Sequence, residues 1–114
     1  MKQLYQPLVS IWTPSWNRAG LLERVWTGLN SQSYKNIEWI IGNDGSTDET
    51  ADVISELASR SEFPVSVITA STRIGKARMD NEGIARARGE FIIECDSDDY
   101  LLPHAVKLLV DTWN

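Results

Sequence analysis

Short apolar runs alternate with longer segments of helical periodicity along this chain, and this alternation restricts the fold more than any other feature. The apolar runs cover residues 8–13, 37–42, 65–69 and 91–95 and are rich in β-branched and aromatic side chains. Each run is followed by a segment with apolar residues at helical spacing, the first over residues 19–32. The order β-α-β-α-β-α-β-α requires a mostly parallel sheet.

Parallel strands need right-handed crossovers, which place helices on both faces of the sheet. We therefore predict an α/β fold with an open, doubly wound, Rossmann-like sheet, formed by residues 1–114 as a single domain. A chain of this length buries roughly two-thirds of the surface that its unfolded form exposes. Ligands of such sheets bind beyond the carboxyl ends of the strands, so the polar loops there are the first candidates for a site.

Three local signals predict where elements begin and end. Pro14 is expected to stop the first strand. Ser46 and Glu49, three residues apart, are typical of a capping box that opens the second helix. Pro103 suits the first turn of the last helix.

Composition excludes several classes of function. The formal net charge of −5 argues against a nucleic-acid partner. Cys95 is the only cysteine, which rules out an intramolecular disulfide and argues against a thiolate zinc site. No apolar stretch approaches the ~20 residues needed to span a bilayer. We therefore expect a soluble, cytoplasmic chain without a membrane span, with Cys95 and His104 outside the chemistry.

The acidic cluster Asp96-Ser97-Asp98-Asp99 follows the fourth apolar run directly. Three carboxylates in four residues repel one another unless something compensates their charge. A hard divalent cation does so, and oxygen ligands suit Mg²⁺ or Mn²⁺. The alternative is a solvated acidic turn that only caps the next segment.

The loop Asn43-Asp44-Gly45-Ser46 leaves the end of the second predicted strand. The Asp44 carboxylate is suited to accept hydrogen bonds from a nucleobase or from ribose hydroxyls, and Gly45 permits a close approach of a ligand to the backbone. The alternative is a turn followed by a helix cap. The glycine patterns of a P-loop and of a dinucleotide-binding fold are both absent, which disfavours a dehydrogenase.

Taken together, the motifs resemble the N-terminal, nucleotide-sugar-binding half of a family 2 glycosyltransferase with the GT-A fold. The resemblance is carried in order by Val9-Ser10-Ile11-Trp12-Thr13-Pro14-Ser15-Trp16-Asn17-Arg18, Leu29-x-x-Gln32-Ser33-Tyr34, Glu38 through Asp48, Gly75 with Asn81 and Gly83, and Gly89-Glu90-Phe91-Ile92 leading into Asp96-Ser97-Asp98-Asp99. It implies inverting glycosyl transfer from a nucleotide sugar, with a UDP-sugar favoured, to an acceptor that the sequence does not identify.

The resemblance also implies roles for individual residues. Thr13 and Asp44 would hold the nucleobase and ribose, with the pocket completed by Pro14, Asn17, Arg18, Gly45 and Asn81. Asp96 would lie near the ribose, the sugar and the metal. Asp98 is the favoured direct ligand of a Mn²⁺ or Mg²⁺ cofactor bound to the diphosphate.

Three departures from the family pattern bear on function. Asn43 replaces the commoner first aspartate of its turn, and Asp80 stands where arginine is usual, with Lys76 or Arg78 as candidates to replace that charge. Relatives normally continue past the Asp-x-Asp motif into the acceptor half, which supplies the general base, and neither is expected within this chain. The alternative function is therefore a catalytically incompetent remnant that binds partners or forms a homo-oligomer through an exposed sheet edge. A location at the cytoplasmic face of a membrane is compatible with either function.

Overall fold

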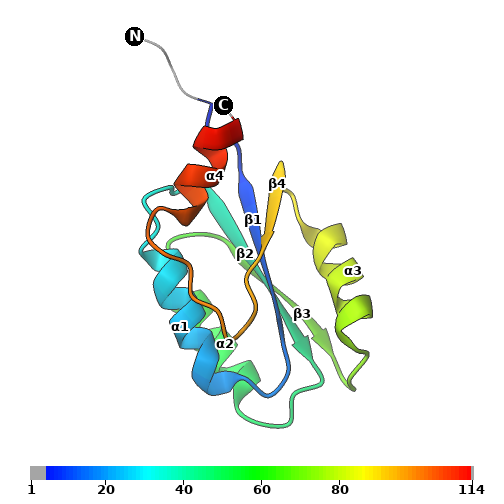
Figure 1. Ribbon diagram of the computed structural model, residues 1–114. Coiled ribbons are helices and arrows are strands. Elements are labelled where there is room, and N and C mark those ends of the chain that lie inside the picture. Colours follow the sequence, from blue (N-terminus) through cyan, green and yellow to red (C-terminus); the bar gives the residue numbers. More distant parts are fainter. Residues whose placement is uncertain (1–4, 114) are drawn as a thin grey trace.

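The computed structural model describes residues 5–113, which form four strands and four helices in strict alternation. The predicted order of elements is confirmed (Figure 1). The elements are β1 (Val9–Ser15), α1 (Ala19–Asn30), β2 (Ile37–Asp44), α2 (Thr50–Arg60), β3 (Val65–Ala70), α3 (Lys76–Arg86), β4 (Phe91–Glu94) and α4 (Ala105–Trp113).

The four strands form one parallel sheet in the order β3-β2-β1-β4. Helix α3 covers one face, and α1, α2 and α4 lie on the other (Figure 1). The predicted doubly wound α/β fold is thus confirmed. Because all strands run in the same direction, the loops that follow them gather at one edge of the sheet, where the candidate site lies.

The larger core fills the face covered by three helices. Ile11, Trp39 and Ile41 of the sheet pack there with Leu22 of α1 and Val106 of α4, all of them buried.

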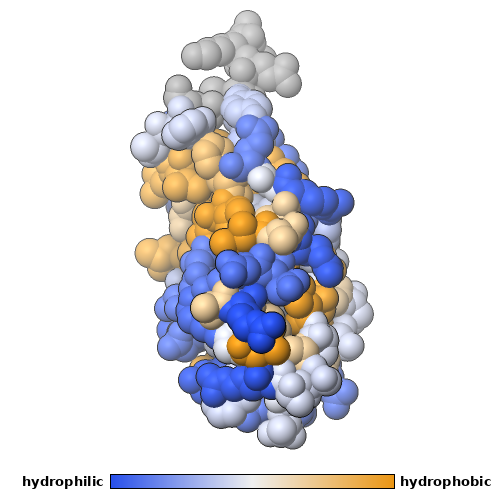
Figure 2. Space-filling view, turned by 90° about the vertical axis from the view of Figure 1, so that its right-hand side faces the viewer, coloured by the Kyte–Doolittle hydropathy of each residue, from blue (hydrophilic) through white to orange (hydrophobic). Residues whose placement is uncertain are grey.

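The outer side of the molecule that carries α3 is mainly hydrophilic, with separate hydrophobic patches (Figure 2). A parallel sheet needs apolar cover on both faces, and α3 provides the second, smaller one.

Trp12 dominates the α3 face, where it packs with buried Ile40 and Met79. Two glycines make room for its indole, because a Cβ atom at Gly42 or Gly83 would lie 2.5 or 2.4 Å from the ring. Any side chain at either position would therefore displace the ring. The sheet and α3 approach each other closely around this one residue.

Two predicted boundaries, the end of the first strand and the start of the last helix, are wrong. β1 continues through Pro14, which pairs with Gly42 of β2. The last β1–β4 pair is Trp12 with Glu94, so Pro14 lies beyond the end of β4 and its missing N–H costs no hydrogen bond there. Helix α4 begins at Ala105, after Pro103 rather than with it in the first turn.

The expected capping box is also wrong. α2 begins at Thr50, whose backbone N–H donates to Asp48 Oδ1 at 3.0 Å, and the Glu49 side chain makes no capping hydrogen bond. The Ser46 hydroxyl instead accepts the backbone N–H of Asn17 at 3.0 Å. A contact with a loop distant in sequence therefore takes the group that a local pattern had assigned to the helix.

Candidate functional site

A pocket of about 230 Å³ opens at the carboxyl edge of the sheet. It lies where the ends of β1 and β2 and the segment that follows β4 meet the loop that precedes α3. Its lining consists of Pro14, Ser15, Trp16, Arg18, Asp44, Arg73, Lys76, Met79, Asp96, Ser97 and Asp98. Five residues predicted for the site are thus brought together: Pro14, Arg18, Asp44, Asp96 and Asp98.

Asp44 fixes the loop that leads into α3. Its carboxylate is buried, and it accepts the backbone N–H groups of Ile74 at 2.6 Å and Gly75 at 2.9 Å, one on each oxygen. Gly45 has a φ of 68°, and a Cβ atom there would lie 2.5 Å from the Arg73 nitrogen. The loops after β2 and before α3 therefore pack directly against each other and form one wall of the pocket.

Two residues predicted for the site, Asn17 and Thr13, form hydrogen bonds with other segments of the chain. Asn17, with a φ of 50°, accepts the backbone N–H of Thr47 on Oδ1 at 2.8 Å and so joins the β1–α1 loop to the β2–α2 loop. The Thr13 hydroxyl is buried and accepts the indole N–H of Trp39 at 2.9 Å. Neither residue lines the pocket, and the ligand contacts that the resemblance implies for them stay predictions.

Asn81 lies apart from this group. It is exposed on α3, outside the pocket lining. Gly45 also lies outside the lining, although the turn that it permits shapes the wall. Their predicted roles with a nucleotide sugar stay predictions.

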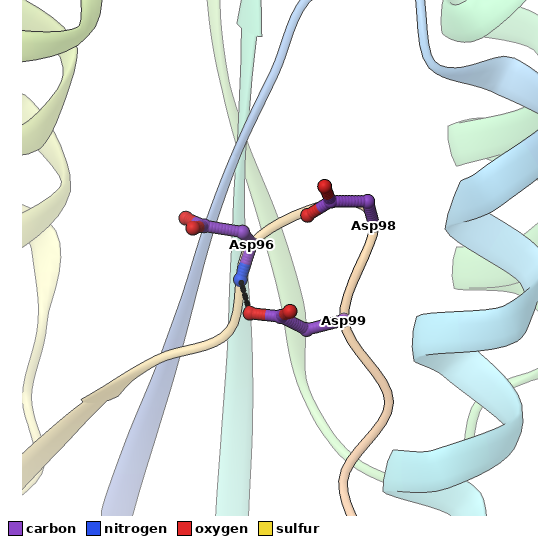
Figure 3. A group of neighbouring side chains, drawn as sticks. All are labelled: Asp96, Asp98 and Asp99. Carbon is purple, nitrogen blue, oxygen red and sulfur yellow. Dashed lines mark hydrogen bonds between the residues drawn. The ribbon is translucent and has the colours of Figure 1, made fainter.

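The acidic cluster forms a tight turn after β4. The Asp99 backbone N–H donates to the Asp96 carbonyl at 2.9 Å, and Asp99 Oδ2 accepts the Asp96 backbone N–H at 3.2 Å. Asp98 and Asp99 extend toward Asp96 (Figure 3). One carboxylate oxygen from each of the three lies within 4.8 Å of the other two, which is a spacing that a single divalent cation can bridge.

Asp96 is the least compensated of these carboxylates. Its Oδ1 is buried and has no hydrogen-bond partner among the described residues. Hydrogen bonding with Glu94, burial and the neighbouring negative charges raise the pKa of Asp96 to about 6. An oxygen in this state gains a partner when a cation binds, so the residues present fit a hard divalent metal ion.

Gln32 holds the segment that follows the acidic turn, a role that the sequence analysis did not assign. Its buried side-chain amide donates to the carbonyl oxygens of Gly28 and Leu102, at 3.0 and 2.7 Å, and its Oε1 accepts the Val106 N–H at 3.1 Å. The chain therefore returns from the turn to α1 along a fixed path. A buried Gln with every polar atom used is a positioning element.

The pocket also contains a cation, Arg73, and an aromatic side chain, Trp16, that were not predicted for the site. The guanidinium of Arg73 lies 4.0 Å from the centroid of the Trp16 ring, which is half-exposed. Arg18 and Lys76 add further positive charge to the lining. A flat aromatic surface beside cations and carboxylates is suited to a ligand with a planar ring and phosphates.

Cys95 and His104 do not line the pocket, and they lie in the core and at the surface respectively, as predicted. Cys95 is buried, and burial with the nearby carboxylates raises the pKa of its thiol to about 12. His104 is exposed and contacts the Ser33 hydroxyl through Nδ1 at 2.8 Å. A thiol held protonated in this way is not a nucleophile at neutral pH.

The family model of Glycosyl transferase family 2 matches residues 10–114. The chain belongs to this family. The match extends from the second residue of β1 through the acidic turn and α4, so it includes every residue that lines the pocket. The resemblance stated from the sequence motifs is confirmed.

Individual family 2 relatives are considerably longer than this chain. It is 39% identical over 102 residues to a chondroitin synthase of Pasteurella multocida, a match that covers 90% of this chain and 10% of the relative. It is 31% identical over 108 residues to a GalNAc(5)-diNAcBac-PP-undecaprenol beta-1,3-glucosyltransferase of Campylobacter jejuni, covering 95% of this chain and 35% of that enzyme. The chain thus spans about a tenth to a third of these relatives.

Solved structures show the same fold. A mannosyltransferase of Pyrobaculum calidifontis, solved in complex with GDP-Man and Mn²⁺, superposes with a TM-score of 0.83 at 26% identity over 95% of this chain and 32% of that one. TarS of S. aureus superposes with a TM-score of 0.82 at 24% identity, covering 90% of this chain and 19% of that one. Within residues 5–113, no helix of this family 2 domain has the length and apolarity needed to cross a membrane.

Proposed function

We propose that this family 2 domain binds a nucleotide-sugar donor together with a divalent cation, for inverting glycosyl transfer to an acceptor. One observation carries the proposal. Asp96, with its buried, unpartnered Oδ1, and Asp98 line the same pocket as the stacked pair of Trp16 and Arg73, and the Asp99 carboxylate lies close to both. These groups suit the metal-bound diphosphate and the base of one ligand.

In this proposal, Asp96 and Asp98 hold Mn²⁺ or Mg²⁺, with Asp99 completing the turn. When bound, such an ion offsets the negative charge that grows on a leaving diphosphate. Asp44 keeps the wall of the pocket in place, and Trp16 offers a surface for a planar base. The P. calidifontis mannosyltransferase, with its GDP-Man and Mn²⁺, supports the ligand class.

The nucleobase is a finer part of the proposal. The resemblance of the motifs favours a UDP-sugar, whereas the mannosyltransferase supports GDP as the second choice. We assign the general base and the acceptor contacts to no residue of this chain. The buried, unpaired thiol of Cys95 suits the reducing cytoplasm, in which we place the domain.

Calorimetric titration tests donor binding. UDP and GDP are titrated into the chain with and without Mn²⁺, and the titration is repeated with Asp98→Ala and with Asp52→Ala. Asp52 is an exposed carboxylate on α2 outside the pocket lining, so it is a matched control for loss of charge. We expect saturable binding that needs Mn²⁺, is weakened at least about tenfold by Asp98→Ala and is unchanged by Asp52→Ala.

A chain that binds neither nucleotide in the presence of Mn²⁺ contradicts the proposal. That result favours the second candidate, a remnant that self-associates. Its supporting observation is the exposure of large apolar side chains on and before α4, with exposed fractions of 68% for Leu102, 63% for Leu108 and 71% for Trp113. Sedimentation of the same sample distinguishes the two, because a self-associating remnant shows a concentration-dependent mass without binding nucleotide.

A further inference from the structure

A chain of polar contacts crosses from β1 through α3 to β4 beside the pocket. The Trp12 indole N–H donates to Asp80 Oδ1 at 2.8 Å. The other oxygen of Asp80 accepts a hydrogen bond from the Lys76 ammonium at 2.8 Å, and the same ammonium lies 3.0 Å from Glu94 Oε2. Glu94 is the last residue of β4, two residues before Asp96. The contacts therefore run from the buried face of the sheet to the end of β4, next to the acidic turn.

Trp12 explains why an aspartate occupies position 80. The indole is buried between the sheet and α3, and its N–H needs an acceptor there. The Asp80 carboxylate supplies one. Asp80 meets this requirement with one oxygen and presents the other to Lys76.

Lys76 then provides the positive charge on this side of the pocket. It lies one turn before Asp80 on α3, and it lines the pocket together with Asp96. An ammonium group has three N–H donors. Asp80 and Glu94 use two of them, so the third can donate to a ligand while the two carboxylates keep the nitrogen in place.

The charge of Lys76 should weaken the binding of a bare divalent cation and strengthen the binding of a diphosphate. Lys76 lines the same pocket as Asp96 and Asp98, so its charge acts on any ligand that binds at the acidic turn. A fixed ammonium repels a bare divalent cation that approaches the same turn, and it attracts the phosphate oxygens of a nucleotide. The neighbouring residue Arg78 is exposed on the same helix and lies outside the pocket lining.

We infer that Lys76, held by Asp80 and Glu94, selects a ligand that carries a diphosphate over a bare divalent cation. This inference rests on the proposed function and deepens it, because it assigns the diphosphate contact to a residue of this chain. Asp80 acts through Lys76 and is a positioning residue.

The test compares three probes on each variant. Binding of Mn²⁺ alone is measured from the loss of its free electron paramagnetic resonance signal, and binding of UDP and of uridine is measured by calorimetry at saturating Mn²⁺. We expect Lys76→Met to tighten binding of Mn²⁺ alone by about threefold, to weaken UDP by about tenfold and to leave uridine unchanged. Arg78→Met removes the same charge from the same helix and should leave all three affinities within about twofold.

A further variant separates positioning from charge. Asp80→Asn keeps an oxygen acceptor for Trp12 but loses its attraction for Lys76, so UDP binding should weaken by about threefold while uridine binding persists. Thermal unfolding confirms that each variant is folded. Lys76 is more than half exposed, so its replacement is not expected to unfold the domain.

The outcomes separate this inference from the proposed function. If the unchanged chain binds UDP with Mn²⁺ but Lys76→Met moves the Mn²⁺ and UDP affinities in the same direction, or moves neither, the inference is wrong and the proposed function stands. If UDP and uridine weaken equally, Lys76 acts on the fold of the pocket and the inference is also wrong. If the unchanged chain binds no nucleotide, both are overturned.

Discussion

Glu38 and Asp96 are carboxylates at opposite ends of the same sheet, and their surroundings differ in one decisive respect. Glu38, near the start of β2, accepts hydrogen bonds from the Ser10 hydroxyl at 2.6 Å, the Arg88 N–H at 2.8 Å and the Arg88 guanidinium at 3.2 Å. Asp96, after β4, keeps a buried Oδ1 without a partner among the described residues.

The pKa values of the two groups follow this difference. Burial by itself raises the pKa of Glu38, but the hydrogen bonds from Ser10 and Arg88 and the charge of Arg88 outweigh it and lower the pKa below its usual value. The pKa of Asp96 is raised to about 6, first by hydrogen bonding with Glu94 and then by burial. Glu38, whose hydrogen-bond partners all belong to this chain, stabilises the fold. Asp96, which keeps an oxygen without a partner, is available to a ligand.

The largest loss of stability is expected when Glu38, the carboxylate with hydrogen bonds to Ser10 and Arg88, is removed. Glu38→Ala leaves the Ser10 hydroxyl and the Arg88 N–H without an acceptor, and it should lower the free energy of unfolding by about 3 kcal/mol. Urea denaturation measures this loss. Asp96→Ala, tested alongside, should not lower the free energy of unfolding. If both variants lose the same stability, the distinction between the two carboxylates is wrong.

An intermediate effect is expected at Asp96. Asp96→Asn keeps the shape of the side chain but removes the charge that would hold a cation, so Mn²⁺ affinity in the presence of UDP should fall at least about tenfold, or about 1.4 kcal/mol. Calorimetry measures the affinity. Glu38→Gln, which makes the same change at the other end of the sheet, should leave Mn²⁺ affinity unaltered in the folded fraction. Equal affinities in Asp96→Asn and the unchanged chain would remove Asp96 from the metal site.

The smallest effect concerns acid stability. Because the pKa of Glu38 is lower in the folded chain than its ordinary value of 4.5, its contribution is complete above that value. The contribution is lost as the pH falls from 4.5 through the lowered pKa of the folded state. Urea denaturation at pH values between 6 and 3 should therefore show an acid-side loss of stability that is reduced in Glu38→Gln, and an identical pH dependence in both proteins would contradict this assignment.

Much of the candidate site follows from the order of the elements. Asp44 and Asp96 come directly after apolar strands of a parallel sheet, so a prediction from sequence places them at the same edge, and the pocket contains both. The resemblance implies that Thr13 holds the nucleotide and that Asn17 shapes its pocket; in the structure, the Thr13 hydroxyl contacts Trp39 and the Asn17 amide contacts Thr47. Nothing local in the sequence indicates these partners, which lie 26 and 30 residues away.

The sequence by itself determined the alternation of strands and helices, the parallel sheet and the edge at which the acidic turn lies, because hydrophobic periodicity and turn residues act over a few neighbouring positions. Only the tertiary structure decided which polar groups are already satisfied. Ser46 contacts Asn17 instead of capping α2, Asp80 serves Trp12, and Asp96 retains an unpartnered oxygen. The physical reason is that a polar group takes whichever partner the packed chain brings within about 3 Å, and for these groups that partner comes from a distant segment.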